Sequence, residues 1–174
     1  YPTGTISPTT HWSNAMKYSL PILTLAATVG IAGSTFAGDA VNYPEGYRNW
    51  THIKTMVLHE GHSLENPFKG IHHVYGNSAA IAGSKTGQFA EGSVLVFDLL
   101  EYNTADNASV EGKRILVGVM VKDSDSYQST GGWGFEGFGG DSRTTRLVED
   151  GGKSCFACHA SQQEHDYVFS TWRE

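Results

Sequence analysis

The pentapeptide Cys155-Phe156-Ala157-Cys158-His159, close to the C-terminus, restricts this chain more than any other feature. Two cysteines separated by two residues and followed directly by histidine form the attachment signature of c-type haem. Each thiol bonds to one vinyl group of the porphyrin, and the adjacent imidazole then lies beneath the iron as an axial ligand. We therefore predict one covalent haem c per chain, held by Cys155 and Cys158, with His159 as the iron ligand.

Other uses of a CxxC pair fit the sequence less well. The chain contains only two cysteines, so a tetrahedral zinc site would lack a second pair of ligands of the usual kind. A thioredoxin-like CxxC lies early in a βαβ unit, at the start of a helix, whereas this motif follows most of the chain. A plain disulfide between Cys155 and Cys158 is the simplest alternative to haem attachment.

The N-terminal residues have the pattern of a targeting segment. Met16 and Lys17 begin a short basic region, residues 20–33 are apolar and uncharged, and small residues precede a cleavage site after Ala37. This order is typical of a secretory signal peptide, and the apolar run is short for a membrane span, although an uncleaved anchor is the alternative. We expect residues 1–15 to be upstream sequence outside the fold, residues 16–37 to be the signal peptide, and residues 38–174 to form the haem-binding domain.

The charge balance narrows the range of partners. The chain has 12 basic against 18 acidic residues, a formal net charge of −6. A net acidic chain without a cluster of lysine and arginine argues against nucleic acid as a partner. Export and the haem motif agree with each other, because c-type haem is attached outside the cytoplasm. We therefore expect a periplasmic protein with no membrane span after cleavage of the signal.

Alternating apolar residues predict a mainly β domain. Strand-like runs occur at residues 55–58, 71–75, 93–100, 115–121 and 133–136, whereas residues 77–85 have a helix-compatible, alanine-rich pattern and residues 102–112 are predicted as a polar loop. We predict a single antiparallel, β-rich domain (mainly β, of the α+β class) with four to six strands, a few peripheral helices, and the CxxCH motif after the sheet. Most small electron-carrying c-type cytochromes are helical, so this pattern points away from them.

Two titratable side chains are candidates for the ligand-binding side of a haem. His72 and His73 are neighbours in a predicted strand and therefore point to opposite faces, so an inward His72 is either a hydrogen-bonded core histidine or a distal haem residue. Glu136 interrupts a run of glycine and aromatic residues, where burial would raise its pKa towards the range useful for a proton acceptor; it is equally well explained as a solvent-facing strand residue. Phe68 either caps such a pocket or fills the core.

Five short motifs follow one another in order through residues 43–173. They are YRxW at 47–50, KTGQFAEGS at 85–93, GWGFE at 132–136, CxxCH at 155–159 and DYVFS at 166–170. Together they resemble the cytochrome P-460 and cytochrome c′-beta family over nearly the whole predicted mature chain. Ala90 and Glu91 depart from the family pattern, in which proline and aspartate are common at these positions.

The resemblance implies a homodimer of β-rich subunits, each with one c-type haem that has His159 on its proximal side and an open distal position. In the P-460 branch a lysine side chain is bonded to the porphyrin edge, and Lys85 stands at the matching position. Such enzymes oxidise hydroxylamine. The c′-beta branch lacks the cross-link and binds nitric oxide or carbon monoxide in a pocket capped by apolar groups.

We therefore expect oxidation of hydroxylamine at a five-coordinate haem cross-linked to Lys85, with Glu136 or His72 as proton acceptor and another periplasmic cytochrome as electron acceptor. The alternative is a nitric oxide-binding protein without the cross-link, in which Lys85 is a surface lysine placed favourably at the end of a helix. A simple electron-transfer cytochrome is a third interpretation. It needs a sixth iron ligand, and Met56 and Met120 lie in strand-like runs that favour core packing.

Overall fold

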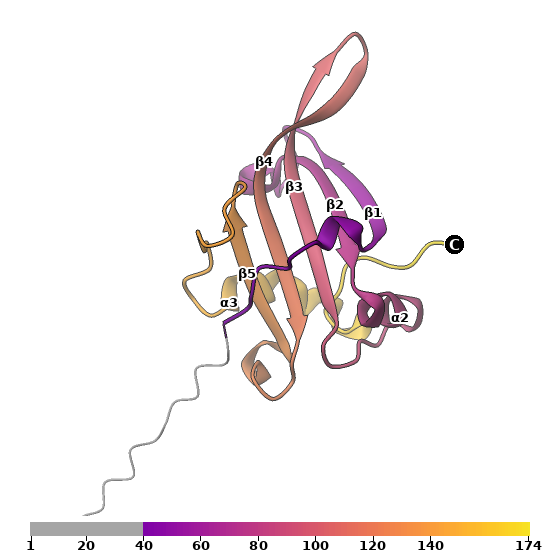
Figure 1. The fold of residues 1–174 in the computed structure, drawn as a ribbon, viewed down its shortest axis with the longest axis vertical. Coiled ribbons are helices and arrows are strands. Elements are labelled where there is room, and N and C mark those ends of the chain that lie inside the picture. Colours follow the sequence, from indigo (N-terminus) through magenta and orange to yellow (C-terminus); the bar gives the residue numbers. More distant parts are fainter. Residues whose placement is uncertain (1–39) are drawn as a thin grey trace, which may run out of the picture. The chain divides into compact units, whose positions relative to one another are not determined.

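Five antiparallel strands form the centre of the computed structural model, which describes residues 40–174 (Figure 1). The strands are β1 (Thr51–Leu58), β2 (Gly70–Gly76), β3 (Val94–Ala105), β4 (Ala108–Lys122) and β5 (Trp133–Gly139). Their order in the sheet is their order in the chain, and every neighbouring pair is antiparallel. The prediction of a mainly β, antiparallel domain with a few helices is confirmed. The predicted signal peptide and the residues before it lie outside the described part of the chain.

Short helices precede, connect and follow the strands. They are the 3₁₀ helices η1 (Tyr47–Asn49), η2 (Gln128–Thr130) and η3 (Ala160–His165), and the α-helices α1 (Glu65–Phe68), α2 (Ser78–Thr86) and α3 (Lys153–His159). The best-defined ends are those of α2. Its first turn is capped by the Asn77 side chain, which accepts a hydrogen bond from the Ala80 N–H at 2.9 Å, and it ends at Gly87, whose φ of 78° suits glycine.

One predicted loop is part of the sheet. Residues 102–112, expected to be a polar loop, instead extend β3 and β4 into a hairpin that projects beyond the other strands (Figure 1). Asp106 and Asn107 make its turn with φ angles of 52° and 60°, a conformation that Asp and Asn tolerate better than most residues. Nearly all residues of this hairpin are exposed on both faces, so no alternation of apolar and polar residues marks it as strand.

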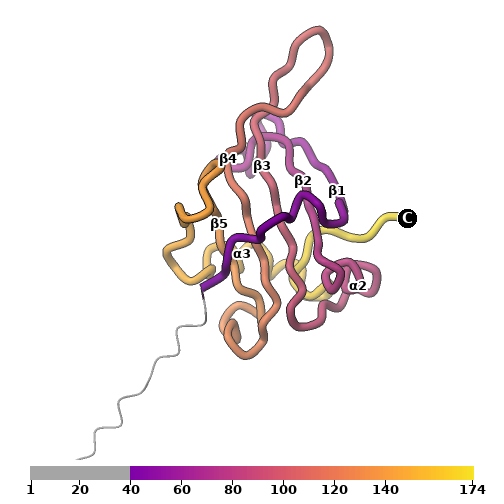
Figure 2. Tube along the Cα trace, in the orientation of Figure 1, coloured from indigo at the N-terminus to yellow at the C-terminus, as the bar shows by residue number. Residues whose placement is uncertain are grey.

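The sheet is covered on both faces. The first face, here named the N-terminal face, holds a buried cluster of Val41, Tyr47, Val96, Val117, Val119 and Phe138. The second, named the α3 face, holds Ile53, Ala80, Phe89, Leu95, Trp133, Phe135 and Val168, with Cys155 and Phe156 of α3 packed against them. Figures 1 and 2 show the N-terminal segment crossing one side of the strands and α3 lying behind the other. The motif helix is thus placed against an apolar sheet surface.

A buried carboxylate fastens the N-terminal segment to the sheet. Asp98 on β3 is completely buried, and it accepts hydrogen bonds from Arg48 (Nε 2.9 Å, Nη2 2.8 Å) and from Arg114 Nε (2.8 Å). Burial alone would raise the pKa of Asp98, but the hydrogen bonds from both arginines help to outweigh it, so the pKa is lowered. This triad therefore ties η1 to β3 and β4 through a charged aspartate.

Candidate functional site

Helix α3 carries both cysteines and the motif histidine. Residues three and four apart are neighbours on a helix surface, so Cys155, Cys158 and His159 are grouped on one side. Both cysteines are free thiols, and burial raises the pKa of Cys155. They are not joined by the disulfide considered above. Among residues 40–174, no group of three or more His, Cys, Asp or Glu side chains is placed to hold a metal ion, so the zinc alternative lacks a ligand set there.

The His159 ring is oriented by the chain that follows α3. Its Nδ1 lies 2.7 Å from the carbonyl oxygen of Tyr167. Because a carbonyl oxygen only accepts, Nδ1 carries the proton and Nε2 keeps a free lone pair. Burial lowers the pKa of His159, with the Tyr167 carbonyl opposing it, and the ring packs 5.1 Å from Phe135 and 5.0 Å from Phe169 between centroids. A neutral imidazole with one nitrogen held by a carbonyl is the form that ligates iron.

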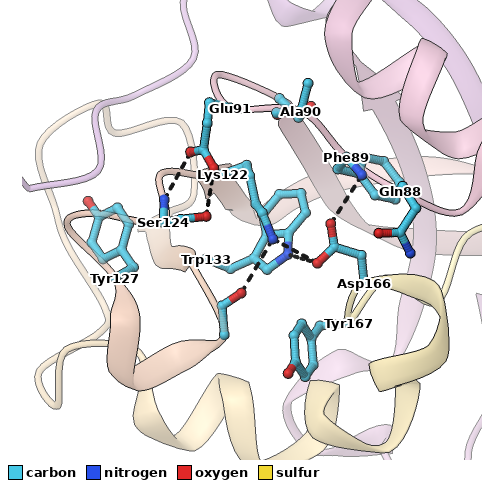
Figure 3. Close-up of polar contacts among 12 residues, drawn as sticks. Gln88, Phe89, Ala90, Glu91, Lys122, Ser124, Tyr127, Trp133, Asp166 and Tyr167 are labelled. Atoms are coloured by element: carbon cyan, nitrogen blue, oxygen red, sulfur yellow. Dashed lines mark hydrogen bonds and ion pairs between the residues drawn. The ribbon is translucent and has the colours of Figure 1, made fainter.

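The turn that carries Tyr167 is anchored by a buried ion pair (Figure 3). Asp166 Oδ1 accepts a hydrogen bond from Lys122 Nζ at 2.7 Å, and Trp133 Nε1 donates to the same oxygen at 3.4 Å. The other oxygen, Oδ2, accepts from the Phe89 N–H at 3.1 Å. The end of β4, the start of β5 and the loop after α2 therefore meet at one carboxylate.

The α3 face provides an apolar surface on the sheet side of the site. Val74, Phe97 and Gly118 stand in register on β2, β3 and β4, and all three are only half-buried. The Phe97 ring packs edge-on against Phe68 at 5.9 Å between centroids. A porphyrin requires wide apolar surroundings and an oriented imidazole. The incompletely covered apolar surface, the free thiols and the imidazole of His159 therefore fit a haem group.

His72 lies on the same face of the sheet as Phe97 and is 2% exposed. Its Nε2 is 2.5 Å from the carbonyl oxygen of Phe68, so Nε2 donates, and its Nδ1 has no hydrogen-bond partner. The ring meets Phe97 edge-on at 4.6 Å between centroids, and burial lowers the pKa of His72. His72 is thus a hydrogen-bonded, buried histidine that holds the backbone of Phe68; its distal role stays a prediction.

Glu136 lies on the face of the sheet away from His159. It stands opposite Val119, a member of the N-terminal face, as the predicted alternation of β5 requires. Its carboxylate accepts from Arg146 Nη1 at 2.7 Å and from two backbone N–H groups at 2.8 and 3.1 Å. The structure does not bring Glu136 together with His159, and the carboxylate is neither solvent-facing nor free. Its role as proton acceptor stays a prediction without a contact on the α3 face.

Lys85 is exposed at the C-terminal end of α2. Its Nζ lies 4.9 Å from the centroid of the Trp172 ring, a cation–π contact with the C-terminal segment. The helix itself borders the site, because Ala80 and Ile81 pack in the same cluster as Cys155. The covalent bond to haem stays a prediction.

The two methionines considered above as iron ligands, Met56 and Met120, differ in burial. Met120 packs against the α3-face cluster, as core packing predicts, whereas Met56 is 49% exposed on the edge strand β1 and is not a core residue. Sequence reasoning also missed Lys122 and assigned no partner to Asp166. The only signal for either residue is the place of Asp166 within the DYVFS motif.

Within residues 40–174 no helix is both long and apolar enough to cross a lipid bilayer. A family model described as cytochrome P460 matches residues 44–170. A search of curated proteins gave no match. The matched residues include the whole sheet, α2, and the α3 helix with Cys155, Cys158 and His159. Because this match covers most of the chain, the chain belongs to the cytochrome P460 family and is a haem protein of that family.

Proposed function

We propose that the protein binds one haem c through thioether bonds to Cys155 and Cys158, with His159 as the proximal ligand, and that it captures a small neutral ligand such as nitric oxide at the opposite side of the iron. When bound, the haem would supply an iron atom that can take such a ligand. The observation that carries this proposal is the pair of Phe68 and Phe97, whose rings meet at 5.9 Å between centroids on the apolar α3 face. His159 packs on the same face through Phe135, and the Tyr167 carbonyl fixes its tautomer.

The positions of the candidate catalytic side chains favour ligand capture over hydroxylamine oxidation. Oxidising hydroxylamine requires groups that remove protons as well as electrons. Of the two expected proton acceptors, Glu136 is bound to Arg146 on the other face, and the Nε2 of His72 already donates to the Phe68 carbonyl. Lys85 rests against Trp172. Nitric oxide has no proton to release and needs chiefly an apolar pocket that excludes water. The sequence alone favoured hydroxylamine oxidation over nitric oxide binding, and we now favour nitric oxide binding.

We expect the Phe97→Leu variant to admit bulkier iron ligands. Shortening this side chain opens the space that we assign to the distal side, so imidazole should bind the ferric protein about tenfold more tightly, since one methylene in an apolar pocket is worth about 10–200-fold. The matched control is Phe138→Leu, on the N-terminal face. Spectrophotometric titration with imidazole measures both. Equal affinities in the Phe97→Leu variant and the wild type would contradict the assignment of Phe97 as a cap.

Hydroxylamine oxidation at a lysine-modified haem is the second candidate. It is favoured by the position of Lys85 on a helix that packs into the same cluster as Cys155, within the motif of the P-460 branch. In this case His72, with its unpartnered Nδ1, is the titratable side chain of the α3 face best suited to accept a proton. Electrons would pass to another periplasmic cytochrome.

Peptide mass spectrometry separates the two candidates. If ligand capture is the function, the tryptic peptide that contains Lys85 will run free of the haem peptide that contains Cys155 and Cys158, and the protein will not turn over hydroxylamine. Lys85→Arg is the control, because it preserves the charge over Trp172 and cannot be expected to form the same bond. A wild-type Lys85 peptide that travels with the haem, and is lost from it in Lys85→Arg, establishes the second candidate instead.

We further propose that maturation takes place in the periplasm and that the protein works as a homodimer. The predicted signal peptide at residues 16–37 and the need to attach c-type haem outside the cytoplasm support the location. The homodimer rests on the resemblance to the P-460 and c′-beta proteins. Light scattering of the mature protein measures its mass in solution directly.

A further inference from the structure

We propose that the Lys122–Asp166 ion pair positions the proximal histidine, by fixing the carbonyl group of Tyr167 against His159 Nδ1. This inference rests on the proposed function, in which His159 ligates the iron. Lys122 and Asp166 are positioning residues, because they act on His159 through Tyr167.

The backbone at this turn adopts a left-handed conformation that Asp166 tolerates and that Tyr167 does not favour. Asp166 and Tyr167 have φ angles of 51° and 65°, two consecutive left-handed residues that are not glycine. This conformation costs energy for residues with a Cβ atom, and it is especially uncommon for a bulky residue such as tyrosine. Strained conformations persist only where the surrounding structure fixes them, and they concentrate at functional sites. Here the turn at Asp166 and Tyr167 brings the Tyr167 carbonyl to His159, eight residues earlier in the chain.

The Tyr167 side chain is held against the backbone of the β4–β5 connection. A Cβ atom on Gly131 would lie 2.5 Å from the Tyr167 ring, so the ring packs directly on this glycine. The ring also lies 5.1 Å from Phe156 of the haem motif, and Val168 is buried in the α3-face cluster. These contacts hold the Tyr167 side chain and Val168 in place, and the ion pair holds the preceding residue, Asp166.

The ion pair is almost completely removed from solvent. The side chains of Lys122 and Asp166 are 10% and 12% exposed. Lys122 Nζ also lies 3.4 Å from the Gly131 carbonyl oxygen and 5.1 Å from the Trp133 ring centroid, while the second Asp166 oxygen accepts from the Phe89 N–H (Figure 3). Removing one member of such a pair leaves an uncompensated buried charge. Without Lys122, the Asp166 charge would draw the turn towards water; without the Asp166 charge, the turn would lose its ionic bond to β4. Either change would move the Tyr167 carbonyl relative to His159.

The hydrogen bond from Nδ1 controls how strongly an imidazole donates to a metal. A carbonyl that accepts this bond fixes the tautomer and raises the basicity of the ligand. A displaced Tyr167 carbonyl therefore weakens the bond from His159 to iron. Weaker donation favours the ferrous over the ferric state, so the reduction potential rises.

The test uses the haem-loaded protein and five substitutions, one of which is needed only if two others do not fold. In Asp166→Asn and Lys122→Met we expect a lower iron–histidine stretching frequency in the resonance Raman spectrum of the ferrous protein, together with a higher reduction potential. Lys122→Arg keeps the cation and should restore both values towards those of the wild type. Asp98→Asn is the matched control: it disrupts a buried ion pair on the other face, so it should lower stability and leave both signals unchanged.

The outcomes are distinct. Unchanged frequency and potential in both Asp166→Asn and Lys122→Met overturn the inference, and so does an equal change in Asp98→Asn. If those two variants do not fold, Asp166→Glu decides, because it keeps the charge and shifts the carboxylate by one methylene: a lowered frequency supports the inference and an unchanged one overturns it. A wild-type protein without an iron–histidine mode overturns the proposed function and this inference with it, whereas a normal mode insensitive to the variants overturns the inference alone.

Discussion

Replacing Cys155 and Cys158 together with serine will leave the protein without covalently attached haem. Each thiol forms one thioether bond, and serine cannot replace sulfur in that reaction. After expression in a host that matures c-type cytochromes, the intact mass of the denatured wild-type protein will include one haem, and that of the double variant will be the mass of the polypeptide alone. Each single variant retains one of the two bonds.

Ser154→Ala is the control for this experiment, because it alters the same helix beside the motif and leaves both thiols in place. It should carry haem like the wild type. Haem that remains bonded to the Cys155→Ser/Cys158→Ser protein after denaturation would show that another side chain attaches it. Lys85 would then be the first position to examine, since α2 borders the site.

Asp98→Ala will lower the free energy of unfolding substantially. Breaking a buried ion pair by removing one partner costs about 3–5 kcal/mol. Here we expect the lower end, about 3 kcal/mol, because the Arg48 side chain is 46% exposed and can be resolvated, whereas Arg114 is 16% exposed. Urea unfolding measures the loss. Asp141→Asn is the matched control, since Asp141 is 84% exposed and pairs with the same Arg114, and it should change stability little.

The same aspartate predicts a pH dependence. The pKa of Asp98 in the folded protein is lower than the value of about 3.9 expected in an unfolded chain. Its contribution to stability is therefore fully present above pH 4 and is lost as the pH falls through the folded pKa. Below about pH 4, the free energy of unfolding of the wild type should decrease with falling pH more steeply than that of Asp98→Ala. Parallel curves would show that the triad does not couple stability to protonation.

Local patterns in the sequence predicted much of this structure, because they report on the faces of single strands and helices. Alternation along β5 puts Glu136 and Phe135 on different faces of the sheet. The CxxCH spacing groups the two cysteines and the histidine that we propose to bind haem. The partner of Glu136 was beyond such reasoning, because Arg146 reaches it across a loop and not along the strand. The hairpin at residues 102–112 was missed since it has no buried face.

The ion pairs of the sheet join residues far apart in the chain, both at the candidate site and on the N-terminal face. Lys122 and Asp166 are 44 positions apart, and Arg48 and Asp98 are 50 apart. No spacing rule links such residues. They come together only when the complete chain has folded. A lysine at the end of a strand and an aspartate after a helix each look like ordinary surface residues until the fold places them side by side.

The order of the strands also sets an order of events. Each strand pairs with the one that precedes it in the chain, so the sheet assembles from short-range connections that close quickly. The cysteines and the Tyr167 turn come after the last strand. Because the chain is made from its N-terminus, the sheet can be complete before the thiols arrive. The haem that we propose would then be attached to a folded surface and would not be the nucleus around which the chain collapses.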